Sequence, residues 1–211
     1  RKRFLLESLI DLHENLKKKG ATLLILKANS SRVFEKLCET RIVNHVYFQA
    51  EIAWNERKEE QVLTQICKNH GVKVIRHFNS VLYNVNSLPF DLKQTPDVFT
   101  QFRKQVETHC SIQEDLPEPT KLYDFNFDHD ENKEESTILK KWLFNTENYI
   151  SIEAIQTEVQ KLGDVDKLTA FPFKGGERFG KQRVEEYLFE TDALASYKET
   201  RNGFIGLHYS S

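Results

Sequence analysis

Apolar side chains in the first part of the chain follow the spacing of an α-helix. They recur at intervals of four, three and four positions, at Leu5, Leu9, Leu12 and Leu16. These intervals place the side chains on one helical face. Three lysines and then Gly20 follow, and cations and glycine are typical of a helix C-terminus. The pattern predicts a helix over residues 2–19.

Short apolar runs then alternate with further helical segments. Residues 21–30 contain a continuous apolar run, which is typical of a strand buried in a parallel sheet. Residues 45–48 and 72–75 predict two more strands. Helical spacing over 32–40 precedes the first of these strands, and helical spacing over 62–67 lies between the two. The fold class predicted by this alternation is α/β, a Rossmann-like parallel sheet covered by helices. A ligand would lie beyond the carboxyl ends of the strands.

Changes in the pattern divide the chain into three predicted parts. Residues 1–112 form the α/β domain, ending with a helix after the sheet. Residues 113–170 begin as an acidic, proline-containing stretch without periodicity and continue as connecting helices. Such a composition is typical of a solvated linker. Residues 171–211 form the last part, in which Gly175-Gly176 predicts the start of another helix.

The composition favours a folded protein of a reducing compartment. Of 211 residues, 39% are hydrophobic and 29% are charged, which supplies a core and argues against disorder. No apolar run approaches the roughly 20 residues needed to span a bilayer, so no membrane association is expected. The net charge of −2 argues against a strongly basic nucleic-acid binder. The three cysteines form no CxxC pair, which favours an intracellular location over a disulfide framework.

Asn55 and Glu56 are the first candidate site residues. They follow the predicted strand 45–48 and lie beside Trp54. An amide next to a carboxylate can hydrogen-bond the donor and acceptor edge of a heterocycle. The alternative is a helix N-terminus, where asparagine caps and glutamate favours the dipole. By composition alone, the helix N-terminus is preferred.

A second candidate group combines hydroxyl groups with cations near the end of the chain. Its members are Tyr197, Lys198, Thr200, Arg201, Tyr209, Ser210 and Ser211. Hydroxyl donors can orient a phosphate while cations offset its charge. A surface helix end with charge pairs explains the same residues equally well.

Other possible sites carry weaker signals. Lys174 before Gly175-Gly176 lacks the full phosphate-loop pattern, so we prefer a turn that starts a helix. The seven histidines lack metal-ligand spacing, so no metal site is expected. Neither a nucleophile elbow nor a supported catalytic cysteine is present in the sequence.

Several stretches resemble the photolyase/cryptochrome family, specifically its cryptochrome DASH branch. The most specific is FPFKGGERFGKQRVEEYLFETDALASYKETRNGFIGLHYSS, in which GGE, YKETRNG and YSS occur in the order typical of that branch. RFLLESLIDLHENLKKKGATLLIL, VYFQAEIAWNERKEEQVL and SVLYNVNSLPFDLKQTPDVFTQFRKQVE are similar to its earlier segments. The resemblance implies that residues 171–211 start an all-α FAD-binding domain. Because the chain has no methionine, we expect it to be an internal part of a longer protein.

The resemblance also implies roles for the candidate residues. Tyr197, Ser210 and Ser211 match family positions that contact the phosphates of FAD. Asn55 and Glu56 match the pair that binds the antenna cofactor 5,10-methenyltetrahydrofolate, and Glu56 is the firmer match because DASH members often differ at the asparagine. His208 stands where the family usually has an acid.

For the complete protein, the resemblance implies a blue-light flavoenzyme, a monomer that acts on single-stranded or damaged DNA. Reduced FAD would split cyclobutane pyrimidine dimers, preferentially in single-stranded DNA, where a base leaves the stack more easily. Residues 1–211 alone are expected to be inactive. Two alternatives remain, a signalling cryptochrome without repair activity and a degenerate α/β binding module.

Overall fold

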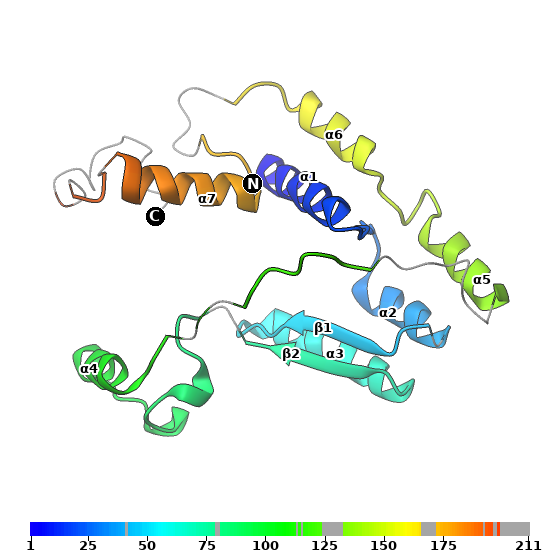
Figure 1. Ribbon diagram of the computed structural model, residues 1–211. Helices are drawn as coiled ribbons and strands as arrows, with labels where there is room; N and C mark the ends of the chain where they lie inside the picture. Colours follow the sequence, from blue (N-terminus) through cyan, green and yellow to red (C-terminus); the bar gives the residue numbers. More distant parts are fainter. Residues whose placement is uncertain are drawn as a thin grey trace. The chain divides into compact units, whose positions relative to one another are not determined.

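The computed structural model describes residues 1–40, 42–78, 81–112, 114, 116–123, 133–165, 172–191, 193–195 and 198 (Figure 1). The chain divides into two compact units. The first comprises Arg1–Lys27, Pro119–Asn126 and Leu143–Ser211, and the second comprises Ala28–Glu118 and Phe127–Trp142. The three segments predicted from the sequence, with boundaries at residues 112 and 170, stay a prediction.

The second unit contains a parallel two-stranded sheet. Strands β1 (His45–Gln49) and β2 (Lys73–His77) pair in register, with Val46 opposite Val74. Helix α3 (Trp54–Asn69) makes the crossover between them, and α2 (Ser30–Glu39) packs against α3. This arrangement confirms the predicted α/β class.

The core of this unit lies between the sheet and the two helices. Its buried members come from α2, α3 and the turn before β2, and are Cys38, Ile66, Cys67 and Val72. Val46 and Val74, one from each strand, pack against this cluster. Tyr47 of β1 is 65% exposed because alternate side chains of a strand point to opposite faces.

Local sequence explains where these elements begin and end. Helix α2 is capped by Asn29, whose side-chain oxygen accepts a hydrogen bond from Ser31 N at 3.0 Å. Gly71 follows α3 with φ of 73°, a conformation that glycine adopts without strain.

Two further helices belong mainly to the second unit. They are α4 (Phe99–His109) and α5 (Lys133–Leu143), and two 3₁₀ turns, Val85–Ser87 and Leu92–Gln94, precede α4. The Arg32 guanidinium of α2 lies 5.9 Å from the ring centre of Trp142 in α5. This distance permits a cation–π contact between the two helices.

The first unit is built mainly from helices α1 (Lys2–Lys18), α6 (Ile152–Lys161) and α7 (Glu177–Glu185). Helix α1 contacts both α6 and α7. Helix α7 continues into a π-helical turn, Glu186–Glu190. The predicted C-terminus of α1 is confirmed, since Gly20 follows it with φ of 84°. None of the helices in the described parts of the chain is long and apolar enough to cross a membrane.

The segment after α1 departs from the prediction of a parallel strand. Leu26 forms an antiparallel bridge with Tyr149. Backbone hydrogen bonds on either side run from Lys27 N to Asn148 O at 2.6 Å and from Ile150 N to Ile25 O at 2.9 Å. The parallel prediction is wrong because the apolar run does not reveal which distant segment pairs with it.

Candidate functional site

The structure places Asn55 and Glu56 in the first turn of α3, just beyond the carboxyl end of β1. Both side chains are exposed. Ala53 is the N-cap residue and makes no side-chain cap, so the alternative in which Asn55 caps the helix is wrong. Glu56 does lie in the first turn, where a carboxylate interacts favourably with the helix dipole.

The ring of Trp54, beside Asn55 and Glu56 in the sequence, does not offer a free face on which a ligand could stack above Lys58. Its side chain is 69% exposed, and the Lys58 ammonium lies 4.1 Å from its ring centre. This is the geometry of a cation–π pair one helical turn apart. A heterocycle that stacked on this face of Trp54 would have to displace Lys58.

Glu60 positions the loop between β1 and α3, a role that the sequence pattern did not indicate. Its Oε1 accepts a hydrogen bond from Glu51 N at 2.6 Å, and its Oε2 lies 3.8 Å from the Arg76 guanidinium of β2. The loop also joins β2 through a hydrogen bond from Ala50 N to His77 O at 2.7 Å. These bonds hold the α3 N-terminus at the carboxyl edge of the sheet, where α/β proteins bind ligands.

The Gly175-Gly176 turn lies directly on α1 in the first unit. Gly175 N donates to Glu7 Oε2 at 2.8 Å, and Arg178 N donates to Asp11 Oδ2 at 3.2 Å. These N–H groups are occupied by carboxylates of the same chain and do not face a phosphate. The prediction of a turn that starts a helix is confirmed.

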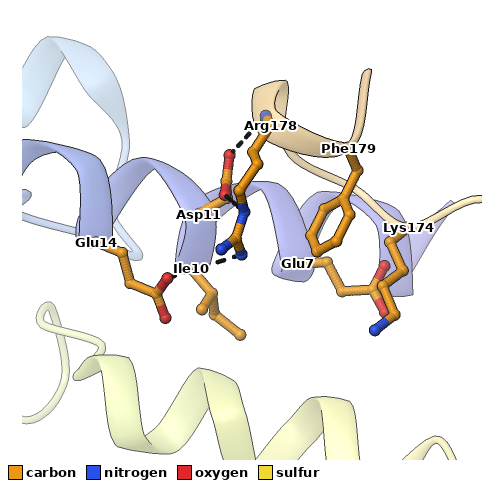
Figure 2. A pocket seen from close by; sticks show the side chains of 7 residues that line it. All are labelled: Glu7, Ile10, Asp11, Glu14, Lys174, Arg178 and Phe179. Atoms are coloured by element: carbon orange, nitrogen blue, oxygen red, sulfur yellow. Dashed lines mark hydrogen bonds and ion pairs between the residues drawn. The ribbon is translucent and has the colours of Figure 1, made fainter. Parts of the chain in front are cut away.

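A cavity of about 180 Å³ lies beside this turn (Figure 2). Its lining consists of Glu7, Ile10, Asp11 and Glu14 from α1, with Lys174, Arg178 and Phe179. The Arg178 side chain extends between two carboxylates, with Nε 3.4 Å from Asp11 Oδ1 and Nη2 3.9 Å from Glu14 Oε2. Asp11 is only 3% exposed, so Arg178 compensates a buried charge. Sequence reasoning missed Asp11, since an aspartate within a helical repeat gives no signal of a distant partner.

The remaining predicted site residues, Tyr197, Ser210 and Ser211, lie outside the described residues. His208 lies outside them as well. The assignment of these three residues to FAD phosphate therefore stays a prediction. Within the described ranges, no cluster of histidine, cysteine, aspartate and glutamate could hold a metal ion.

Comparisons with known proteins identify relatives along the whole chain. A sequence profile of the DNA photolyase family matches residues 1–120. "Cryptochrome DASH" of Xenopus laevis is 36% identical over 213 residues, which cover 100% of this chain and 37% of that protein. "Cryptochrome DASH" of Danio rerio is 35% identical, with coverage of 100% and 38%. The chain thus spans less than two fifths of these relatives' length.

The fold leads to the same family. A crystal structure of the Synechocystis sp. cryptochrome matches with a TM-score of 0.76 and 27% identity, covering 100% of this chain and 40% of that one. The match includes the parallel sheet region and the helices that follow in sequence. The chain belongs to the photolyase/cryptochrome family, in its cryptochrome DASH branch.

Proposed function

We propose that this chain is part of a blue-light flavoprotein that splits cyclobutane pyrimidine dimers, preferentially in single-stranded DNA. The observation that carries the proposal is similarity to cryptochrome DASH proteins along the entire chain. That similarity includes the last block, which contains Tyr197, Ser210 and Ser211. The photolyase/cryptochrome family normally binds FAD, and we assign binding of the FAD phosphates to these three residues.

In this proposal the protein holds and orients its cofactor, while FAD supplies the light-driven electron. Hydroxyl groups of Tyr197, Ser210 and Ser211 would donate hydrogen bonds to phosphate oxygens. Lys198, which is exposed, and Arg201 would offset the phosphate charge. A pyrimidine dimer leaves the base stack more easily in single strands, which supports the preferred substrate.

We assign Asn55 and Glu56 to a folate antenna, 5,10-methenyltetrahydrofolate. The donor set fits this group, because both side chains are exposed at the edge of the sheet and together offer an amide donor and carboxylate acceptors. When bound, the folate would supply light absorption. Glu56 would accept hydrogen bonds from the folate ring, and its place in the first turn of α3 favours the charged carboxylate.

The antenna assignment is tested by Glu56→Gln in the full-length polypeptide. We expect the folate absorbance at about 380 nm to be lost and the flavin absorbance at about 450 nm to be retained. Gln61→Ala, an exposed change on the same helix, should leave both bands unchanged. Equal loss of both bands in Glu56→Gln would contradict the assignment.

The function itself is tested by purifying the full-length polypeptide and measuring its spectrum and its light-dependent repair. We expect bound flavin and faster dimer splitting in single-stranded than in duplex DNA. Bound flavin without repair would favour a signalling cryptochrome. A colourless protein would leave only an α/β binding module.

A further inference from the structure

The cavity drawn in Figure 2 has an acidic wall on helix α1. Residues spaced four and three positions apart share a helical face, and on this face the wall consists of Glu7, Asp11 and Glu14. Ile10 of the same helix adds an apolar side chain, and the rest of the lining consists of Lys174, Arg178 and Phe179. The volume of about 180 Å³ corresponds to about six water molecules, so a ligand of a few heavy atoms can enter.

Asp11 presents a buried acceptor that lacks a hydrogen bond. The residue is 3% exposed, and its Oδ2 accepts from Arg178 N at 3.2 Å. Its Oδ1 is also buried but accepts no hydrogen bond within the described parts of the chain. Arg178 Nε lies 3.4 Å from Oδ1, which is an ion pair but not a hydrogen bond. Because a buried acceptor without a donor is costly, Oδ1 is available to an N–H group that enters the cavity.

Glu14 presents a second acceptor at the same end of the cavity. Its Oε2 lies 3.9 Å from Arg178 Nη2, beyond hydrogen-bond distance, and its side chain is 46% exposed. Glu7 differs, because its Oε2 accepts from Gly175 N at 2.8 Å and its Oε1 lies 3.6 Å from Arg3. The acceptors left for a ligand are therefore those of Asp11 and Glu14.

Charge favours a cation at this end. Asp11 and Glu14 share one guanidinium, that of Arg178, so the three groups together carry one net negative charge. Figure 2 shows Lys174 and Glu14 at opposite ends of the labelled group, with Arg178 and Phe179 between them. The Lys174 ammonium lies 5.4 Å from the ring centre of Phe179. Its repulsion of a second cation is therefore weakest beside Glu14.

We propose that this end of the cavity binds the ammonium group of a primary amine, either a free amine or a lysine side chain. The ammonium would donate N–H groups to Asp11 Oδ1 and to Glu14. An ammonium is compact and has three donors, which suits two carboxylates that already flank a planar guanidinium. A metal ion is not proposed, because no cluster of histidine, cysteine, aspartate and glutamate in the described ranges could hold one.

The first test is a titration of the full-length polypeptide with ethylammonium chloride, followed by saturation-transfer difference NMR. We expect saturable binding with a dissociation constant of about 1–10 mM, as a ligand of few atoms allows. Tetramethylammonium carries the same charge but no N–H donor, so it should give no saturable signal. Equal binding of the two cations, or no saturable binding of ethylammonium, would overturn the proposal.

The second test compares charge-removing variants that differ in location. Glu14→Gln should weaken ethylammonium binding by up to about fivefold, the size of a half-exposed ion pair. Glu177→Gln is the matched control, since Glu177 is an exposed acid on α7 outside the lining, and it should bind like wild type. Asp11→Asn should weaken binding about tenfold or more, because it removes a charged acceptor. If Asp11→Asn does not fold, the other two variants still decide, and equal effects of Glu14→Gln and Glu177→Gln would overturn the proposal.

A third measurement identifies the source of the ammonium group. The tripeptide acetyl-Gly-Lys-Gly-amide is titrated beside ethylammonium. Tighter binding of the peptide would support the site and identify a lysine side chain as its occupant, whereas tighter binding of ethylammonium would support it for a free amine. Neither titration requires bound flavin or folate, so the result is independent of the proposed function.

Discussion

The Sγ atoms of Cys38 in α2 and Cys67 in α3 lie 4.0 Å apart, and both thiols are buried and free. Burial, together with the neighbouring Cys67, raises the pKa of the Cys38 thiol well above its ordinary value of 9.0. Because the thiolate is the reactive form, the Cys38 thiol should react slowly. Burial keeps reagents away from Cys67 as well. Cys110 is only partly buried, although its Sγ donates to Ser87 O at 3.0 Å. We expect a thiol reagent at mildly alkaline pH to label Cys110 first and the other two only after unfolding; labelling of Cys38 at the rate of Cys110 would contradict this.

The raised pKa of Cys38 also makes stability depend on pH. Above about pH 9 the unfolded thiol ionises while the folded one stays protonated, so the unfolded state binds fewer protons. The free energy of unfolding therefore falls as pH rises, by up to about 1.4 kcal/mol per pH unit for this group. Cys38→Ala lacks this contribution, so the stability difference between wild type and variant should shrink above that pH. Chemical denaturation at several pH values measures it, and a constant difference would reject the raised pKa.

Gly175 should be intolerant of any side chain. A Cβ atom there would fall 2.0 Å from the backbone oxygen of Phe4, and backbone in α1 cannot move aside without disturbing that helix. We expect Gly175→Ala to destabilise the protein by about 2 kcal/mol or more. Gly180→Ala is the matched control, since nothing lies within 4 Å of its Cβ position. Alanine there should stabilise α7 by about 0.5–1 kcal/mol, and equal effects of the two changes on urea denaturation would refute the close approach.

Ser151 should stabilise the start of α6. Its Oγ accepts a hydrogen bond from Ala154 N at 3.2 Å, so Ser151→Ala should cost about 1 kcal/mol while Ser151→Asp keeps the cap. The pKa of Glu153 is lowered first by the hydrogen bond that its carboxylate accepts from its own backbone N–H and then by the one that it accepts from the Ser151 side chain. Ser151→Ala should therefore raise the pKa of Glu153 toward its ordinary 4.5, which an NMR titration can follow. An unchanged pKa in Ser151→Ala would show that the serine has no part in it.

Glu158 should report on the contact between α1 and α6. Its pKa is lowered first by Lys161 of its own helix, at 2.9 Å, and then by Lys2 of α1, at 3.0 Å. A lowered pKa means that this contribution to stability is present above the ordinary value of 4.5 and is lost as pH falls. Lys2→Ala should raise the pKa of Glu158 only in part, because Lys161 remains, and Lys18→Ala should leave it unchanged. If Lys2→Ala has no effect in an NMR titration, the two helices do not pair through this carboxylate.

Periodicity and capping residues allowed much of the local structure to be predicted. The leucine repeat located α1, and Gly20 marked where that helix ends, because glycine adopts positive φ without strain. Apolar runs located β1 and β2. Asn55 and Glu56 were correctly expected near the carboxyl edge of the sheet. The pairing of Leu26 with Tyr149 could not be predicted, since strand pairing joins residues whose separation leaves no periodic signal.

The sequence by itself determined the helices of the described regions, the parallel α/β class and the family, because these depend on spacing between neighbouring residues and on recurring motifs. Only the tertiary structure decided that Glu7 and Asp11 hold the Gly175-Gly176 turn. The reason is physical, since a carboxylate on a helix looks the same in sequence whether it faces water or a distant backbone N–H. Folding selects between these environments through close approach and burial, which depend on the whole chain.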